Sequence, residues 1–280
     1  MVKYYAQFGE DIVIDAILKA IDIDKYNHND ITYVDCGSNH PVNNSNTYFF
    51  YERGVSGILV EPNLQLGKEI RQIRPKDKLI QAVVSDKYND EFYFFVAPND
   101  ALSSISQSMV ENFYEKKDNI NIRNELKREV VKNFHINDVL AKAPLLNKLW
   151  VLSVDCEGYD DAIIQAIDFK RFKPNVIVYE RKHNINCDHP DDCSGDTYGI
   201  LIKNNYVRVC MTLANSIFVL ESNLLENKVN KACKSLLKKF CDKKIMIYER
   251  KKYRGKIKRF FRLAYYKKKL AKYILKIFYK

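Results

Sequence analysis

Carboxylates stand where several apolar, strand-length segments of the sequence end. Asp35, Glu61, Asp86 and Asp155 close four such segments, ITYVDC, SGILVEP, KLIQAVVSD and KLWVLSVDCEG. In an open parallel sheet, ligands bind beyond the carboxyl ends of the strands. We therefore expect these side chains to surround one ligand, where a carboxylate accepts hydrogen bonds or takes up a proton.

The first strand end favours one kind of ligand. Asp35 is followed by a single glycine, Gly37, and then by the segment SNHP (38–41). The loop lacks the G-x-G-x-x-G pattern that sets backbone amides against a pyrophosphate, and Pro41 removes one amide donor. A dinucleotide is therefore disfavoured, whereas S-adenosyl-L-methionine, which has no phosphate, needs only a close backbone approach to its amino-acid part. Glu61, 26 positions after Asp35, suits an acceptor for ribose hydroxyls.

The segments that carry these strand ends alternate between helical and extended patterns. Helical patterns occur at 11–21, 46–54, 64–73 and 160–168, and strand-like runs at 31–36, 56–62, 78–86, 148–158 and 174–181. Segments 206–211 and 215–221 are expected to form a closing pair. This order predicts an α/β fold with a Rossmann-like, doubly wound and mostly parallel sheet. Between about 87 and 136 the pattern loosens, which suits an insertion over the ligand edge of the sheet.

Charge divides the 280-residue chain into two parts. Residues 226–280 hold 21 of the 46 Lys and Arg residues but three of the 35 Asp and Glu residues, so this segment carries +18 and the remainder −7. With 46% hydrophobic residues, the chain can bury one substantial core. We therefore predict a main domain over 1–225 and a basic helical C-terminal tail over 226–280.

The end of the tail has the pattern of an amphipathic helix. Six apolar residues recur three or four positions apart among lysines and arginines: Phe260, Leu263, Tyr266, Leu270, Ile274 and Ile277. Basic helices with one apolar stripe commonly lie on anionic membrane surfaces. Peripheral membrane association through residues 256–280, or docking to a partner, is favoured over nucleic-acid binding, because the aromatic residues follow the stripe. Packing of the tail on its own acidic domain is the remaining alternative.

The composition also bears on location and on metal binding. No run of about 18 apolar residues is present, and the seven cysteines are scattered, which favours a cytoplasmic protein with reduced thiols. Cys187 and Cys193, with His183 and His189 nearby, do not have the spacing of a usual zinc knuckle, so a polar loop is the simpler interpretation.

Several blocks of the sequence, taken in order, resemble the FkbM-type methyltransferases. The blocks are YAQFGEDIVIDAIL, YVDCGSNHPVNNSNTYFFYERGVSGILVEP, AVVSD and LSVDCEGYDDAIIQAIDF, followed by PNVIVYE and NSIFV. The resemblance covers about residues 4–220 and leaves the tail outside it. It implies a class I methyltransferase fold and transfer of a methyl group from S-adenosyl-L-methionine, largely to sugar or polyketide hydroxyls.

The resemblance also implies roles for individual residues. Asp35, Gly37 and Asn39 would line the methionine end of the donor, Glu61 would hold the ribose, and Val83 and Asp86 would border the adenine. Gln7, Glu10 and Asp11 would close over the cofactor; otherwise, they start a helix. The chain departs from many relatives at His40-Pro41, where they have a glycine nearby.

The block Asp155-Cys156-Glu157-Gly158 is where we expect the chemistry. Methyl transfer to an alcohol requires that its oxygen be positioned and its proton accepted. Asp155 is the predicted base or orienting group, and Glu157 either assists or shares a divalent cation with it.

Further ionisable residues flank these two. His183 is a second candidate base, and His40 is an alternative to it. Glu180 either completes an acidic site floor or pairs with Arg181 or Lys182, and Asp160 and Asp161 are expected to cap a helix.

Taken together, these features predict an S-adenosylmethionine-dependent O-methyltransferase that acts on a sugar hydroxyl of a glycan or glycan precursor. Two alternatives stay open. One is a nucleotide- or NAD-binding Rossmann enzyme of sugar metabolism, and the other is a nucleic-acid methyltransferase that uses its basic tail.

Overall fold

The structure is a computed structural model that describes residues 3–21, 29–88, 91–97, 103–118, 126–144, 148–180, 195–212 and 214–223. The predicted tail over 226–280 and the predicted base His183 lie outside the described residues.

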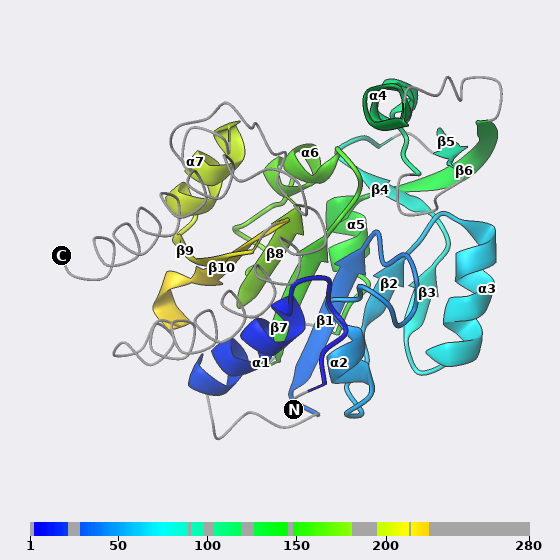
Figure 1. The fold of residues 1–280 in the computed structure, drawn as a ribbon. Helices are drawn as coiled ribbons and strands as arrows, with labels where there is room; N and C mark the ends of the chain where they lie inside the picture. The colour runs from blue at the N-terminus through cyan, green and yellow to red at the C-terminus, as the bar shows by residue number, and fades with distance from the viewer. Residues whose placement is uncertain are drawn as a thin grey trace, which may run out of the picture.

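Helices and strands alternate along the described chain (Figure 1). The helices are α1 (Glu10–Ile21), α2 (Tyr48–Tyr51), α3 (Leu64–Ile73), α4 (Gln107–Asp118), α5 (Ile136–Leu140), α6 (Asp160–Gln165) and α7 (Gly195–Lys203), with a 3-10 turn η2 (Glu221–Asn223). The strands are β1 (Ile31–Cys36), β2 (Ile58–Val60), β3 (Lys78–Ile80), β4 (Val83–Ser85), β5 (Glu91–Val96), β6 (Lys127–His135), β7 (Leu149–Val154), β8 (Val176–Glu180), β9 (Tyr206–Met211) and β10 (Asn215–Leu220).

Seven strands form the main sheet, in the order β3-β2-β1-β7-β8-β10-β9. The pairs from β3 to β8 are parallel, and β10 runs antiparallel to both β8 and β9. The predicted closing pair is therefore confirmed. From β1, the strands β2 and β3 are added towards one edge of the sheet, whereas β7 and β8 are added towards the other. Ligands bind where the order changes in this way, so the carboxyl ends of β1 and β7 are the expected ligand edge.

Helices cover both faces of this sheet, and each interface is a hydrophobic core (Figure 1). On one face, apolar residues of α1 and α2, with Ile70 of α3, pack against alternate residues of β1, β7 and β8, such as Tyr33 and Val151. On the other face, α5, α6 and α7 pack against the intervening residues, such as Val34 and Leu152. Strands buried on both faces read as continuous apolar runs, which is why the sequence shows them clearly.

The predicted strand over 78–86 is wrong as a single element. The chain turns after Ile80, where the Ala82 amide donates to the Ile80 carbonyl oxygen at 3.0 Å. The Gln81 side chain donates to the carbonyl oxygens of Glu61 (2.6 Å) and Asn63 (3.0 Å), which fixes this turn to the end of β2. The second half of the segment, β4, therefore leaves the main sheet and pairs with β6.

The loosely patterned region between 87 and 136 contains regular structure that the sequence did not predict. β6 lies between β4, to which it is parallel, and β5, to which it is antiparallel, in a second sheet of three strands. Helix α4 lies above this sheet (Figure 1). The insertion does reach the ligand edge, because the Ser104 hydroxyl donates to the Glu157 carbonyl oxygen at 2.9 Å.

Two further features bear on the predictions from composition. The cysteines of the described chain, Cys36, Cys156 and Cys210, carry free thiols. Within the described ranges, no helix is both long enough and apolar enough to cross a membrane.

Candidate active site

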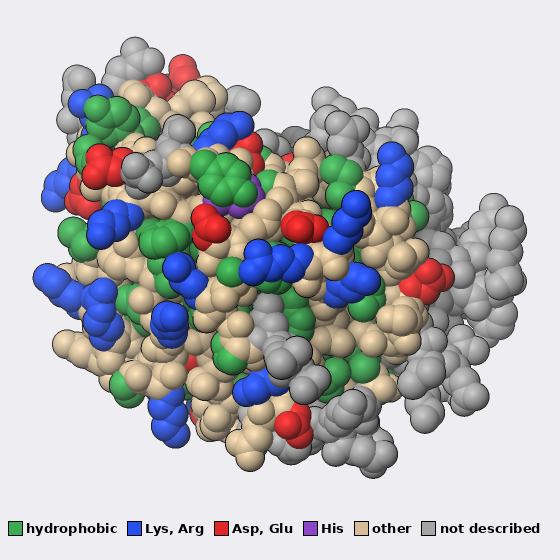
Figure 2. Space-filling model, turned by 180° about the vertical axis from the view of Figure 1, so that it is seen from behind, with side chains coloured by type: hydrophobic (Ala, Val, Ile, Leu, Met, Phe, Trp, Pro, Cys, Tyr) green, Lys and Arg blue, Asp and Glu red, His purple; other side chains and the backbone are tan. Residues whose placement is uncertain are grey.

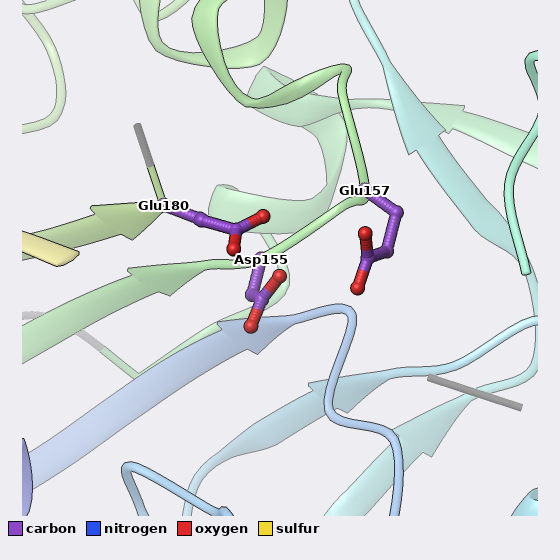
Figure 3. Close-up of side chains that lie close together, drawn as sticks. All are labelled: Asp155, Glu157 and Glu180. Atoms are coloured by element: carbon purple, nitrogen blue, oxygen red, sulfur yellow. The ribbon is translucent and has the colours of Figure 1, made fainter. Parts of the chain in front are cut away.

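Three carboxylates meet at the ends of β7 and β8. One carboxylate oxygen from each of Asp155, Glu157 and Glu180 lies within 4.8 Å of the others. Figure 3 shows that Asp155 and Glu180 follow neighbouring strands, and that Glu157 reaches back towards them from the loop after β7. Among the described residues, none of the three forms an ion pair with Lys, Arg or His. The structure thus brings Asp155 and Glu157, the predicted residues of the loop after β7, together with Glu180. The sequence had left Glu180 open between a site floor and an ion pair with Arg181 or Lys182.

A tight turn presents Glu157. Glu157 and Gly158 both have left-handed backbones, with φ of 45° and 97°. A non-glycine residue rarely adopts such a φ, and exceptions gather at functional sites. The Asp160 carboxylate holds the turn by accepting hydrogen bonds from the amides of Cys156 (2.7 Å) and Gly158 (3.0 Å). Asp160 therefore supports the loop after β7 from the first turn of α6. The predicted capping by Asp160 and Asp161 is wrong, because the N-cap residue is Tyr159 and it makes no side-chain cap hydrogen bond.

The three carboxylates hold protons more tightly than ordinary acids do. Burial raises the pKa of Glu157 to about 8, and the nearby charge of Glu180 adds to the rise. Burial, then the charge of Asp160, raises the pKa of Glu180 to about 7. Burial and the charge of Glu180 raise the pKa of Asp155 well above its usual range. Such a cluster can accept a proton near neutral pH, or its oxygens can hold a hard divalent cation.

The loop after β1 lies directly against this cluster. Gly37 has a φ of 77°, and a Cβ atom at this position would come within 1.9 Å of the Asp155 carbonyl oxygen. The Asp155 amide donates to the Cys36 carbonyl oxygen at 2.9 Å, which ties the two strand ends together. The position therefore requires glycine, both for its conformation and for the close backbone approach.

The Asp35 carboxylate is buried beneath this loop, with 4% of the residue exposed. It accepts a hydrogen bond from the Thr47 hydroxyl at 2.6 Å and another from Ser153. Asn46 donates to the Ser153 hydroxyl at 3.2 Å, so residues 46 and 47 are both fixed to strand ends. Asp35, predicted to line the donor, holds the loop in place from below.

Glu61 lies beside the same loop. Its two carboxylate oxygens accept hydrogen bonds from the backbone amides of Asn39 and Asn63, both at 2.8 Å. Asn39 has a left-handed backbone with a φ of 49°, which asparagine tolerates. These contacts fix the direction of the carboxylate predicted to accept from the ribose.

Ser38 offers a test of whether a cofactor fits here. Its hydroxyl is buried, with 6% of the residue exposed, and it has no hydrogen-bond partner among the described residues. Buried polar atoms normally have partners, so an orphan hydroxyl indicates a missing one. The unpartnered Ser38 hydroxyl and the close backbone approach at Gly37 together fit a ligand with polar groups. The amino-acid part of S-adenosyl-L-methionine is such a ligand.

The residues predicted to border the adenine lie on the second sheet. Val83 begins β4 and is 5% exposed. Asp86 follows β4 and pairs with Lys87 at 2.7 Å, and its other carboxylate oxygen is buried without a partner among the residues that the structure describes. The two follow the turn at Gln81 that contacts the end of β2, which keeps them on the Glu61 side of the site.

At the amino terminus, the two acids of the QFGED segment have structural contacts. Asp11 accepts hydrogen bonds from the amides of Tyr5 (2.6 Å), Ala6 (3.3 Å) and Ile12 (2.9 Å), and burial raises its pKa to about 6. Gln7 is exposed on the turn that these bonds form. The same turn contacts the first loop through a bridge between Ala6 and Asn44. Of the three residues predicted to close over the cofactor, Gln7 has its side chain at the surface, and the buried Glu10 and Asp11 form the first turn of α1.

Another candidate, His40, has a structural role. The Nδ1 atom of His40 accepts hydrogen bonds from the amides of Val42 (3.0 Å) and Asn43 (2.9 Å), so its ring closes a turn of the first loop. Thr47 and Arg74, which organise that loop, were not among the predicted site residues. A buried arginine before a proline has no sequence pattern that separates it from a surface arginine.

The fold is Rossmann-like, with carboxylates at the ends of its central strands. The sequence model of one protein family, described as "Methyltransferase FkbM domain", matches residues 35–195. The matched span runs from Asp35 past Glu61, Asp155 and Glu180, and it covers more than half of the chain. The chain therefore belongs to the FkbM methyltransferase family and is a methyltransferase. Comparisons with curated proteins and with solved structures gave no match.

Proposed function

We propose that the protein transfers the methyl group of S-adenosyl-L-methionine to a sugar hydroxyl of a glycan or glycan precursor. The observation that carries this proposal is the convergence of Asp155, Glu157 and Glu180 beside the Gly37 loop. Family membership supports the donor, because methyltransferases of this family generally use it. When bound, S-adenosyl-L-methionine supplies an electrophilic methyl group on a sulfonium.

The protein's own task is to orient the acceptor and take its proton. A new oxygen–carbon bond forms as the carbon–sulfur bond breaks with its electron pair on sulfur, and the hydroxyl proton must leave. Asp155 is the proposed proton acceptor, because it belongs to the cluster and its backbone is held against the first loop. Glu157 and Glu180 would accept hydrogen bonds from neighbouring hydroxyls of a sugar. His183 remains a proposed second base, to be tested by substitution.

Calorimetry tests the donor. We expect S-adenosyl-L-methionine and S-adenosylhomocysteine to bind the purified chain and to compete with each other, and NAD not to bind. Radiolabelled methyl transfer to nucleotide sugars and to oligosaccharides then identifies the acceptor class. Binding of NAD without binding of S-adenosyl-L-methionine would refute the proposal.

The same three carboxylates are the proposed holders of a divalent cation. Three carboxylate oxygens form a hard donor set that suits Mg²⁺ or Mn²⁺, and a cation there would lower the pKa of a bound hydroxyl. Electron paramagnetic resonance of Mn²⁺ mixed with the protein measures binding directly, with Glu180→Gln as the variant and Asp161→Asn as the control. If wild type and Glu180→Gln leave the same amount of Mn²⁺ free, the cation proposal is wrong.

The basic tail is proposed to hold the enzyme, as a cytoplasmic protein, at an anionic membrane surface. Its sequence carries +18 and one apolar stripe. Figure 2 shows that Asp and Glu side chains on the visible face of the described chain are scattered among Lys and Arg. That face offers the tail no concentrated acidic surface, which favours a membrane over intramolecular packing there.

Vesicle flotation tests this proposal with the full chain. We expect it to float with phosphatidylserine vesicles and not with neutral ones, and Leu270→Glu with Ile274→Glu to abolish flotation. Tyr265→Glu with Tyr279→Glu adds the same charge on the opposite side of the predicted helix and is the control. Binding to RNA that weakens steeply with salt, without flotation, would favour the nucleic-acid alternative instead.

A further inference from the structure

Arg74, the residue after α3, is a buried hub beneath the first loop. None of its surface is exposed, although it carries a charge. Each of its five N–H donors has a partner: Asp77 Oδ2 (2.7 Å), Pro41 O (3.4 Å), Ser45 Oγ (3.3 Å), Tyr33 Oη (3.0 Å) and Thr47 Oγ1 (3.0 Å). Three of these partners belong to the loop between β1 and α2. One side chain therefore fixes the far half of the loop that begins at Gly37.

The hydrogen bond from Arg74 to Thr47 fixes which way the hydrogen bond between Thr47 and Asp35 points. A guanidinium can only donate, so the Thr47 hydroxyl oxygen accepts from Arg74 and has its own hydrogen to give. That hydrogen goes to Asp35 Oδ2 at 2.6 Å. Asp35 Oδ2 must then act as an acceptor there, and such a hydrogen bond stabilises the ionised form of the carboxylate most strongly. The ion pair with Asp77 and the Tyr33 hydroxyl, which donates to Asp77 at 2.7 Å, hold the guanidinium in place.

We propose that Arg74 is a positioning residue for donor binding: through Ser45 and Thr47 it sets the shape of the first loop, and through Thr47 it keeps Asp35 as an anion. This inference rests on the proposed function, since it concerns the same donor. S-adenosyl-L-methionine carries a positive sulfonium and an ammonium group. A loop shaped in advance and an anion beneath it favour binding of such a cation.

Several charged or titratable groups surround Asp35. Arg74 and Asp77 face it from the end of α3 and the following turn, Asp155 from the end of β7, and Cys36 adjoins it. Burial raises the pKa of the Asp35 carboxyl, while the Thr47 hydrogen bond and the charge of Arg74 lower it. Loss of the Thr47 hydroxyl should therefore make Asp35 easier to protonate.

A pair of isosteric substitutions tests the relay, by which we mean the hydrogen bonds from Arg74 to Thr47 and from Thr47 to Asp35. Thr47→Val removes the hydroxyl between Arg74 and Asp35 and leaves the Arg74–Asp77 ion pair in place. Thr32→Val is the control, because Thr32 is equally buried, and its hydroxyl donates to the Ser56 carbonyl oxygen at 2.9 Å, outside the relay. Calorimetry of S-adenosyl-L-methionine binding from pH 5 to pH 9, with melting curves for both variants, measures affinity apart from folding.

We expect Thr47→Val to bind the donor at least about tenfold more weakly than Thr32→Val at pH 7. We also expect the loss of binding on acidification to begin at a higher pH in Thr47→Val, a shift that a structural role alone would not produce. Arg74→Lys keeps the charge but cannot make the forked contacts, and it should weaken binding in the same direction.

The two ideas fail in different ways. If the wild-type protein does not bind S-adenosyl-L-methionine, the proposed function fails. If the wild type binds and Thr47→Val matches Thr32→Val in affinity and in pH profile, the function stands and the role of Arg74 is refuted.

Discussion

A Cβ atom on Gly37 would lie 1.9 Å from the carbonyl oxygen of Asp155, so the first loop and the end of β7 meet backbone to backbone. The lack of a side chain at Gly37 is what lets the first loop lie against the end of β7, next to the carboxylate cluster. The φ of 77° at Gly37 adds a second requirement for glycine. The contact joins two residues that are 118 positions apart in the sequence.

Gly37→Ala is expected to destabilise the protein by more than about 2 kcal/mol and to abolish donor binding, because backbone atoms cannot yield as a flexible side chain can. Gly199→Ala is the control, since a Cβ there meets nothing within 4 Å. That helical substitution should stabilise the protein by about 0.5–1 kcal/mol. Urea unfolding measures both, and equal stability of the two variants would contradict the prediction.

Asp155→Asn is expected to lower kcat by about 10²- to 10⁴-fold, because the amide cannot accept the hydroxyl proton. The asparagine has the same shape as the aspartate, and its backbone still contacts Gly37. The Kd for S-adenosyl-L-methionine should therefore change little. Asp161→Asn, in the first turn of α6 but outside the cluster, should keep normal turnover. Single-turnover methyl transfer and calorimetry separate the two effects. A variant with full turnover would remove Asp155 from the chemistry.

The raised pKa of Glu157 predicts a stability that depends on pH. Its pKa is about 8 in the folded protein and close to 4.5 in the unfolded chain, so the folded state binds the proton more tightly between these values. The free energy of unfolding should therefore rise as the pH falls from about 8 towards 4.5. At full effect one such proton contributes about 1.4 kcal/mol per pH unit.

Glu157→Gln should reduce this slope, and Glu91→Gln, an exposed glutamate on β5, should not. Urea unfolding at pH 6, 7 and 8 without added metal provides the measurement. Equal slopes in Glu157→Gln and wild type would show that the Glu157 carboxyl titrates normally in the folded protein.

The sequence predicted the central strands well because burial on both faces leaves continuous apolar runs. ITYVDC and LWVLSV are β1 and β7, and both are fully buried. The strand predicted over 78–86 failed because hydrophobicity cannot report a change of sheet. That change depends on the Gln81 side chain bonding to carbonyl groups of residues 61 and 63. β6 was missed because charged and apolar residues mix along it, and Val130 is 58% exposed.

In the site too, the sequence predicted what depends on neighbouring residues and missed what depends on contacts between distant ones. Asp155 could be predicted because it ends a strand, and Glu180 satisfies the same rule one strand further along. The role of Asp35 could not, since it depends on Thr47 and on an arginine 39 positions away. The positions of Glu61 and Asn39 follow from strand order, but the hydrogen bond between them needs the folded loop.

Glu10 links the amino-terminal segment to the far edge of the sheet and provides a last prediction. Its side chain accepts hydrogen bonds from the Thr212 hydroxyl (2.6 Å), the side-chain amide of Asn215 (3.1 Å) and the backbone amide of Phe8 (2.8 Å). Glu10 is fully buried. Glu10→Ala should destabilise the protein by about 3 kcal/mol, because it leaves several hydrogen-bond donors inside the protein without an acceptor. The exposed substitution Glu91→Ala should stay within about 0.5 kcal/mol of wild type. A double-mutant cycle with Thr212→Val should give a coupling energy above about 0.5 kcal/mol, and strict additivity would mean that Glu10 does not hold β9 and β10 to α1.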